Sequence, residues 1–398
     1  MLNKITHDLR TFLYSFFLLL SVLTAQGQSY PFSEDTRISV LTMGPGPDLA
    51  EKFGHSAFRI NDPTNGIDVI YNYGVFDFEA PNFLLNFAKG KMIYKLDTGK
   101  YELYKNYYAS QGRWMKEQVL NLSQEEMIVV ATYLQNNAKP ENSSYLYDFF
   151  FDNCATKMRD VLEISLGDDL TVSDAYVPEQ FTFRELIQQK LNANSWGSVG
   201  IDIALGSIID RTATPSQHQF LPDYVYEAIK VATINHNGVD ATLVLKENDL
   251  LIRKKLSTDL SFLWSPLVFF SLITLLILYT TYKDNKQQTR SRFLDFTLLF
   301  ITGIAGLLLF LLWTATDHTA TANNYNMLWA FPLNLILGFV LIKKNPPRWS
   351  RKYVFFLLVL FSLLSIHWIS GVQVFAPALI PLFIALIVRY IYVWKFLK

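Results

Sequence analysis

The chain has little cysteine and no excess of either charge, and each scarcity excludes a class of protein. Cys154 is the only cysteine in 398 residues, which excludes an intramolecular disulfide framework and a cysteine-rich zinc site. The 35 basic and 35 acidic residues cancel, so the net charge is zero. The sequence also lacks the basic face with interleaved aromatics that is typical of nucleic-acid binding. The stretch GPGP (44–47) has the wrong spacing for a phosphate-binding loop, and its prolines lack N–H donors. We therefore expect no metal and no cofactor.

Apolar residues, by contrast, are abundant. The chain is 51% hydrophobic and 15% aromatic, and its mean hydropathy of +0.17 is too high for one ordinary soluble domain. Five apolar stretches near the C-terminus approach the roughly 20 residues that a helix needs to cross a bilayer. We therefore predict a transmembrane domain of five helices over residues 261–398. The stretches are 264–282, 293–313, 327–342, 353–369 and 375–394.

Basic residues predict how these helices are oriented. Lysine and arginine follow the first, third and fifth stretches, whereas the connections 314–326 and 370–374 carry neither. By the positive-inside rule, the C-terminus is cytoplasmic and residues 28–260 lie on the other side. Residues 1–27 agree, because Lys4 and Arg10 precede a short apolar run, as in a secretory signal peptide. An uncleaved N-terminal anchor stays an alternative.

Residues 28–260 read as an exported α+β domain that contains the lone thiol. Cys154 follows Asn153 at the predicted start of a helix, and Met158, Val161 and Leu162 continue on the same face. A thiol at a helix N-terminus feels the positive end of the helix dipole, which lowers its pKa toward the reactive thiolate. The alternative, that Cys154 is a buried small hydrophobe, stays open.

A thiol nucleophile needs a base, and histidine is the usual one near neutral pH. His55 lies in KFGHSAFRI (52–60), where alternation predicts the start of a strand. His218, in the loop-like TPSQHQ (214–219), is the weaker alternative. A third polar group that orients the imidazole would come from the strand predicted at 67–73, where Asn72 and Asp68 share one face. The spacing does not choose between them.

The order of these residues is the reverse of papain, since the histidine precedes the cysteine. This order is typical of a circularly permuted papain-like fold, as in NlpC-type and lecithin:retinol acyltransferase-like enzymes. The motifs GHSAFR (54–59), YNYGVFDF (71–78), DNCAT (152–156) and FLPDY (220–224), in this order, resemble the Lnb family of lipoprotein N-acyltransferases. The resemblance extends over nearly all of the mature chain, including the membrane helices.

That resemblance implies a thiol-dependent acyltransferase of the bacterial inner membrane, with its catalytic domain in the periplasm. Cys154 would attack an ester of a membrane phospholipid, His55 would take the thiol proton, and Asn72 would orient His55. The N-terminal amine of a diacylglyceryl-cysteine lipoprotein would then accept the acyl chain. Backbone N–H groups at the start of the Cys154 helix suit the developing oxyanion.

Substrate contacts are predicted at two further places. Asn153 adjoins the nucleophile, and Asp317 and His318 lie in a polar connection, 316–326, on the same side of the membrane. That connection forms either a rim that binds headgroup or acceptor peptide, or simply a solvated link. Four aromatic residues are predicted to be core, with contact to acyl chains at the membrane surface as the alternative; these are Phe76, Phe78, Phe83 and Phe87.

Two rival functions fit part of the sequence. A membrane-anchored NlpC-type cell-wall amidase or peptidase would explain the thiol and the export, but a single anchor would suffice for it. A non-enzymatic envelope assembly factor would carry Cys154 as a buried relic. The first rival does not explain five apolar stretches, and replacing Cys154 by serine would distinguish the second, because a binding module should keep its function.

Overall fold

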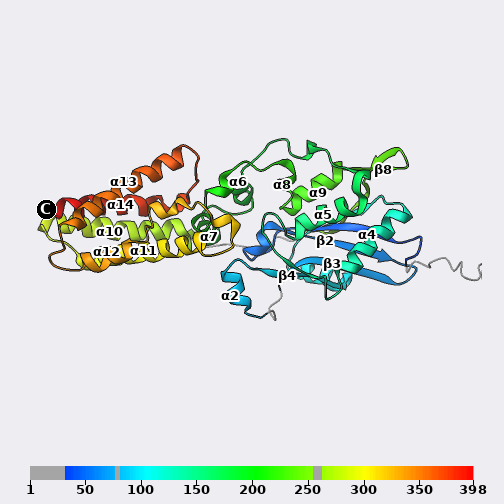
Figure 1. Cartoon of the computed structure of the whole chain (residues 1–398), viewed down its shortest axis with the longest axis horizontal. Helices are drawn as coiled ribbons and strands as arrows, with labels where there is room; N and C mark the ends of the chain where they lie inside the picture. The colour runs from blue at the N-terminus through cyan, green and yellow to red at the C-terminus, as the bar shows by residue number, and fades with distance from the viewer. Residues whose placement is uncertain (1–31, 77–80, 254–261, 398) are drawn as a thin grey trace, which may run out of the picture.

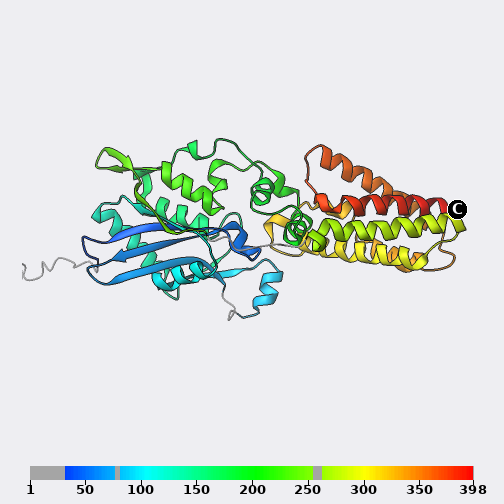
Figure 2. The same ribbon diagram turned by 180° about the vertical axis from the view of Figure 1, so that it is seen from behind.

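The computed structural model describes residues 32–76, 81–253 and 262–397, which form two parts along one long axis (Figure 1). The part up to residue 253 combines strands and helices, and the part from residue 262 is a bundle of helices. The C-terminus lies at the end of the bundle farthest from the strands, as the view from behind also shows (Figure 2). The predicted signal peptide, residues 1–27, and Phe78 lie outside the described residues.

A seven-stranded sheet forms the centre of the first part. Its strands are β1 (Arg37–Met43), β2 (His55–Asp62), β3 (Ile67–Phe76), β4 (Ile93–Lys100), β5 (Met115–Leu120), β6 (Ser144–Leu146) and β10 (Val244–Leu251). They are ordered β10-β5-β1-β2-β3-β4-β6, and every neighbouring pair is antiparallel. A small second sheet joins β7 (Leu170–Thr171), β8 (Thr233–His236) and β9 (Val239–Thr242).

Helices cover both faces of the large sheet. Because successive side chains of a strand point to opposite faces, Val40 and Phe58 share a core with α4, α5 and α9, whereas Leu41 and Ala57 pack with α3. These elements are α3 (Tyr101–Ser110), α4 (Gln124–Asn137), α5 (Cys154–Leu166) and α9 (Pro222–Val231). Shorter helices complete this part: α2 (Phe83–Ala88), α6 (Phe183–Gln188), α7 (Trp196–Ala204), α8 (Pro215–His218), η1 (Ala50–Phe53), η2 (Gly167–Asp169), η3 (Asp174–Tyr176) and η4 (Ser207–Asp210). The result is a mixed α/β domain.

Four helices of the second part are long and apolar enough to cross a membrane. They are α10 (Pro266–Gln287), α11 (Arg292–Thr314), α13 (Trp349–Ile369) and α14 (Ile380–Phe396), the last preceded by η8 (Pro377–Leu379). The first, second, fourth and fifth predicted stretches fall on them. The short elements here are η5 (Phe262–Trp264), η6 (Thr319–Thr321), η7 (Tyr325–Leu328) and α12 (Asn334–Leu341).

The prediction of one long helix over 327–342 is wrong. This stretch is broken into η7 and the eight-residue α12, because Pro332 lacks an N–H and disfavours helix in the residue before it. The segment nevertheless runs the length of the bundle. Asn326 Nδ2 donates to the Asp202 carbonyl at the end near the sheet (2.9 Å), and the Lys343 carbonyl accepts from Arg290 at the other end (2.9 Å).

Glycines of α11 make room for this broken segment. A Cβ on Gly306 would lie 1.8 Å from the Ala330 carbonyl oxygen, and one on Gly303 would lie 2.2 Å from the Leu335 nitrogen. Such close backbone approach needs small residues, as is usual between membrane helices.

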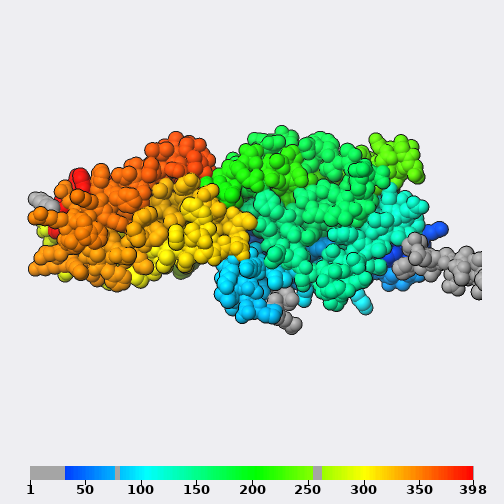
Figure 3. All heavy atoms as spheres, viewed as in Figure 1, coloured from blue at the N-terminus to red at the C-terminus, as the bar shows by residue number. Residues whose placement is uncertain are grey.

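The two parts are joined by backbone contacts as well as by the chain. Asn324 Nδ2 donates to the carbonyls of Ile203 (2.8 Å) and Ala204 (3.0 Å) at the end of α7. A Cβ on Gly206 would lie 1.9 Å from the Ala322 carbonyl oxygen. The space-filling view shows the parts in contact over this junction (Figure 3). The first part is therefore held against one end of the bundle.

Candidate active site

Cys154 is the first residue of α5, and the chain approaches it through a firmly capped turn. Asn153 is the N-cap, and its Oδ1 accepts from the N–H groups of Ala155 (2.8 Å) and Thr156 (2.9 Å). The Thr156 hydroxyl accepts from the N–H of Asn153 in return (2.8 Å). This reciprocal capping box fixes the start of the helix and therefore the position of the thiol.

His55 reaches the thiol from the first position of β2. Its imidazole hydrogen-bonds the Cys154 side chain, and its Nε2 donates to Asn72 Oδ1 over 2.5 Å, which leaves Nδ1 for the thiol. The structure thus brings Cys154, His55 and Asn72 into one group. Of the two predicted alternatives for the third residue, Asp68 lies elsewhere, since its carboxylate binds Arg59 through two hydrogen bonds of 2.7 and 2.8 Å.

The charges in this group favour a thiolate beside an imidazolium. Burial would raise the pKa of the Cys154 thiol, but the charge of His55, its hydrogen bond and the N–H groups of Ser56 and Ala155 lower it below its usual value. Burial would likewise lower the pKa of His55, yet the charge of Cys154 and the hydrogen bonds to Cys154 and Asn72 raise it. Each group stabilises the ionised form of the other, and the thiolate is the nucleophilic state.

An irregularity in β3 shapes the space above the thiol. The register with β4 shifts between Asn72 and Val75, and Gly74 has a φ of +88°, which favours glycine. A Cβ there would lie 3.4 Å from the Cys154 Cβ and 3.9 Å from its nitrogen. The bulge lets Asn72 face His55, and the bare glycine leaves open the approach to Cys154. Gly74 belongs to the motif at 71–78, but no role was predicted for it from the sequence. A glycine inside a strand is nevertheless a signal of a bulge.

His218, the alternative base, has a structural place. Its Nδ1 donates to the Thr214 carbonyl (2.8 Å), and its Nε2 accepts from the N–H of Phe181 (3.3 Å). The side chain is fully buried. Because both ring nitrogens are used within the fold, His218 joins the short helix α8 to the chain at Phe181 and has no free nitrogen for a thiol proton.

The prediction that Asn153 contacts substrate is wrong. Its side chain is buried, with 3% exposed, and all of its hydrogen-bonding capacity is used inside the protein. Besides capping α5, its Nδ2 donates to the carbonyls of Phe149 (2.7 Å) and Phe220 (2.8 Å). Asn153 therefore positions Cys154 from beneath and has no atom left for a substrate.

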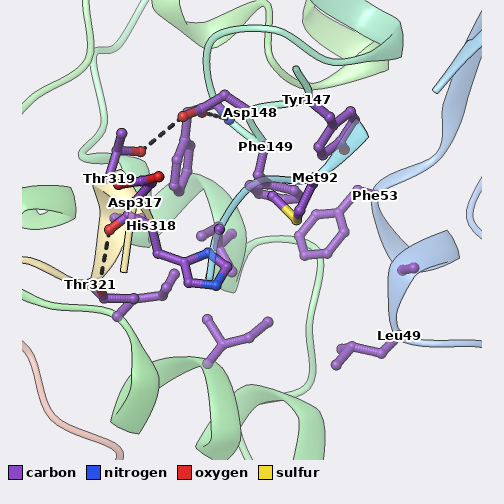
Figure 4. Close-up of a pocket in the computed structure, with 17 residues that line it drawn as sticks. Leu49, Phe53, Met92, Tyr147, Asp148, Phe149, Asp317, His318, Thr319 and Thr321 are labelled. Atoms are coloured by element: carbon purple, nitrogen blue, oxygen red, sulfur yellow. Dashed lines mark hydrogen bonds between the residues drawn. The ribbon is translucent and has the colours of Figure 1, made fainter. Parts of the chain in front are cut away.

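A cavity of about 430 Å³ lies between the two parts and is lined by residues of both (Figure 4). Phe53, two residues before His55, lines it, and so does Tyr147, whose pKa is raised by burial and by the charge of Cys154. The volume is within the range of small-molecule sites, about 300–1,000 Å³. Its apolar wall is made by Leu49, Phe53, Met92, Phe149, Phe150, Ile187, Ile201, Leu205 and Ala320. Sequence reasoning missed this wall, because its residues come from segments far apart in the chain.

Asp317 and His318 line the same cavity from the side of the bundle. The His318 imidazole points into it (Figure 4). The loop is fixed to the first part, since the Asp317 N–H donates to the Lys89 carbonyl (2.8 Å) and the Thr319 hydroxyl donates to Asp148 Oδ2 (2.9 Å). Contact of these two side chains with a substrate stays a prediction.

These features define a class of protein: a strand-and-helix domain with a cysteine–histidine–asparagine group, joined to membrane helices. Residues 30–189 match the family model described as the Lnb N-terminal periplasmic domain, and residues 257–398 match the Lnb transmembrane domain. The chain therefore belongs to the Lnb family, which confirms the family predicted from its motifs. It is a membrane protein with a periplasmic domain, and its family indicates an enzyme.

Other comparisons found no likeness. No curated protein and no solved structure matches the chain. The circularly permuted papain-like fold therefore stays a prediction, although the order of histidine and cysteine still favours it.

Proposed function

We propose that this protein is a lipoprotein N-acyltransferase. It moves an acyl chain from a membrane phospholipid, through a thioester on Cys154, to the N-terminal amine of a diacylglyceryl-cysteine lipoprotein. Two observations carry the proposal: the group of Cys154, His55 and Asn72, and an apolar cavity that is lined by both the periplasmic domain and the membrane bundle. A thiolate suits acyl transfer, and an apolar cavity at the end of membrane helices suits a lipid chain.

In the first step, the Cys154 sulfur attacks the ester carbonyl of the phospholipid, and a tetrahedral oxyanion forms. When this intermediate collapses, the bond between the carbonyl carbon and the glycerol oxygen breaks. The His55 imidazolium gives its proton to that oxygen, so lysophospholipid leaves and the acyl chain stays on sulfur. Asn72 holds the imidazole by accepting from Nε2, which keeps Nδ1 directed at the thiol and the leaving group.

The oxyanion needs hydrogen-bond donors. Asn153 already accepts from the N–H groups of Ala155 and Thr156, which leaves the N–H of Cys154 itself as the donor at the start of α5. The open position next to Gly74 lies beside this N–H. We assign the carbonyl oxygen to that space.

In the second step, the neutral amine of the lipoprotein attacks the thioester carbonyl. His55, now neutral, takes a proton from the attacking nitrogen, and the carbon–sulfur bond breaks to give an amide and the Cys154 thiolate. The group returns to the ion pair in which it began. The cavity lined by Phe53 and Phe149 would hold the acyl chain through both steps, which keeps the thioester carbonyl in place.

The test uses the purified full chain in lipid. With phospholipid and no acceptor, the peptide that contains Cys154 should gain a fatty-acyl mass that hydroxylamine removes. A diacylglyceryl-cysteine peptide added next should discharge it and gain that mass at its amine. Cys154→Ala should do neither, and the matched control His236→Ala should do both, since His236 pairs with Glu126 (3.2 Å). N-acylation by Cys154→Ala would refute the thioester route.

The same preparations separate the rival functions. An amidase or peptidase would change cell-wall muropeptides and leave the lipoprotein N-terminus unmodified. An assembly factor would keep its function when Cys154 is replaced by serine. The apolar wall of the cavity favours the acyltransferase, because cell-wall peptides are polar.

A further inference from the structure

The helix α2 exposes its largest apolar side chains. None of its residues is buried, so the prediction that Phe83 and Phe87 belong to the core is wrong. Leu84, Leu85 and Phe87 are exposed by 80%, 53% and 45%. Single exposed apolar residues are common on soluble proteins, but here they make up half of a six-residue helix. A patch of this kind indicates a surface that is covered in the working protein.

The residues after α2 dock on the membrane bundle. The Lys89 carbonyl accepts from the N–H of Asp317 (2.8 Å), and a Cβ on Gly90 would lie 2.6 Å from the His318 nitrogen. Asp317 follows the end of α11, at Thr314, by three residues. Figure 1 shows α2 projecting from the sheet domain next to this end of the bundle, and Figure 3 shows it as a knob at the junction.

Aromatic residues mark the same end of the bundle as a membrane interface. Trp264, just before α10, is 81% exposed, and Leu263 is 74% exposed. Trp196 Nε1 donates to the Trp264 carbonyl (2.9 Å), and the Trp196 ring contacts Phe269 of α10 at 5.3 Å. Tryptophan concentrates where membrane helices leave the hydrocarbon. The patch of α2 therefore adjoins the level at which α10 and α11 leave the bilayer.

We propose that α2 dips into the outer leaflet of the membrane that the bundle spans, with Leu84, Leu85 and Phe87 among the lipid chains. Its surroundings suit this occupant, because Lys89 and Lys91 follow the helix and are exposed, although Lys91 Nζ also lies 3.9 Å from Asp317 Oδ2. Basic residues beside an apolar patch attract anionic headgroups. Gly90 and Met92, directly after α2, line the cavity. The inserted helix thus brings the rim of the cavity to the level of the lipid ester groups.

The test places one label at a time on the full chain. In a Cys154→Ser background the chain has no other thiol, so Leu84→Cys gives a single site for an environment-sensitive fluorophore. Leu272→Cys, in the middle of α10 and 62% exposed, is the control for lipid. Val239→Cys, 68% exposed on the hairpin of β8 and β9 at the far end of the domain, is the control for water.

In vesicles of phosphatidylcholine and phosphatidylglycerol, the label at position 84 should emit at short wavelength and be quenched by chain-brominated lipid, as at position 272. Emission like that at position 239 would overturn the proposal. Shielding that appears only after acceptor peptide is added would assign the patch to the lipoprotein. Shielding that appears only at high protein concentration, without quenching by brominated lipid, would assign it to a second copy of the chain. Either result would also overturn the proposal.

A second measurement rests on the proposed function. The double variant Leu84→Gln and Leu85→Gln should lower acyl transfer from bilayer phospholipid several-fold, yet leave acylation of Cys154 by a short-chain soluble thioester unchanged. Equal losses with both donors would show damage to the site and contradict the proposal. The labelling experiment does not depend on the activity measurement, because it needs no catalysis. Membrane contact by α2 can therefore be tested even if the proposed acyltransferase function fails.

Discussion

Replacement of Asn153 by alanine distinguishes a positioning role from a substrate contact. The side chain caps α5 and donates to the buried carbonyls of Phe149 and Phe220. Loss of an N-cap costs about 0.5–2 kcal/mol, and each buried carbonyl left without a donor costs roughly 1–3 kcal/mol. Because costs at neighbouring groups do not add fully, we expect a total loss of roughly 3–5 kcal/mol in the free energy of unfolding.

Thermal unfolding of the full chain, followed by tryptophan fluorescence, measures this loss. A domain of this size loses about 2–4 °C of Tm per kcal/mol, so the first transition should fall by about 6–20 °C. Hydrogen exchange along α5 should quicken as well. The matched variant Asn153→Asp keeps the cap acceptor but loses both donors, and its charge should raise the pKa of Cys154 and slow alkylation of the thiol. An Asn153→Ala protein with an unchanged Tm and no transfer would refute the reasoning and restore a substrate contact.

Further predictions concern the thiol group and the bundle. His55→Ala should lower transfer on the order of 10²–10⁴-fold, measured as N-acylated peptide; near-normal rates would exclude His55 as the base. The rate should be bell-shaped in pH, with its acidic limb below the ordinary cysteine pKa of about 8.5 and its alkaline limb above the ordinary histidine pKa of about 6.5. Since the Asn72 hydrogen bond raises the pKa of His55, Asn72→Ala should move the alkaline limb to lower pH, and an unmoved limb would contradict this. Gly74→Ala adds about 1–2 kcal/mol of strain at a positive φ and fills the space above Cys154, so kcat should fall while alkylation by a small reagent persists. Gly306→Leu should reduce the yield of monodisperse protein in detergent, because its Cβ would meet the Ala330 carbonyl; a normal yield would contradict that packing.

Hydropathy predicted the membrane part well wherever a helix is uninterrupted. Four of the five stretches are helices of 20 to 23 residues. The stretch 327–342 differs because a buried asparagine lies on each side of the break at Pro332. Asn326 donates to the Asp202 carbonyl, and Asn334 donates to the Thr302 hydroxyl. Hydropathy averages over such residues. A proline followed by an asparagine within a short apolar stretch was the available signal for a broken crossing.

The sequence also predicted Cys154 at a helix start and His55 at a strand start, where the structure has them, because such starts have local signals. It could not choose between Asn72 and Asp68, which share a face by spacing alone. The choice depends on two tertiary facts, the bulge at Gly74 and the pairing of Asp68 with Arg59. Asn153 was misassigned for a related reason, since closeness in sequence to a nucleophile does not tell which way a side chain points.

The cavity gives the membrane bundle a place in the proposed site, because residues 317–321 of the bundle line it. The Thr319 hydroxyl donates to the Asp148 carboxylate, and the Asp317 N–H donates to the Lys89 carbonyl. These hydrogen bonds fix the 316–326 loop of the bundle to the part of the cavity wall that precedes Cys154 in the chain. With the domain fixed to the bundle, the thiol lies at a constant distance from the bilayer. A lipid chain in the cavity would then need no reorientation of the domain to reach the thiol. A periplasmic domain on a flexible tether would lose that alignment even with its Cys154 group intact. Asp148 also accepts from the N–H groups of Phe150 and Phe151 in the turn before Cys154, so the test changes Thr319 alone. We expect Thr319→Ala to lower transfer from bilayer phospholipid while thiol alkylation stays normal, and a parallel loss of both would show that this contact supports the fold instead.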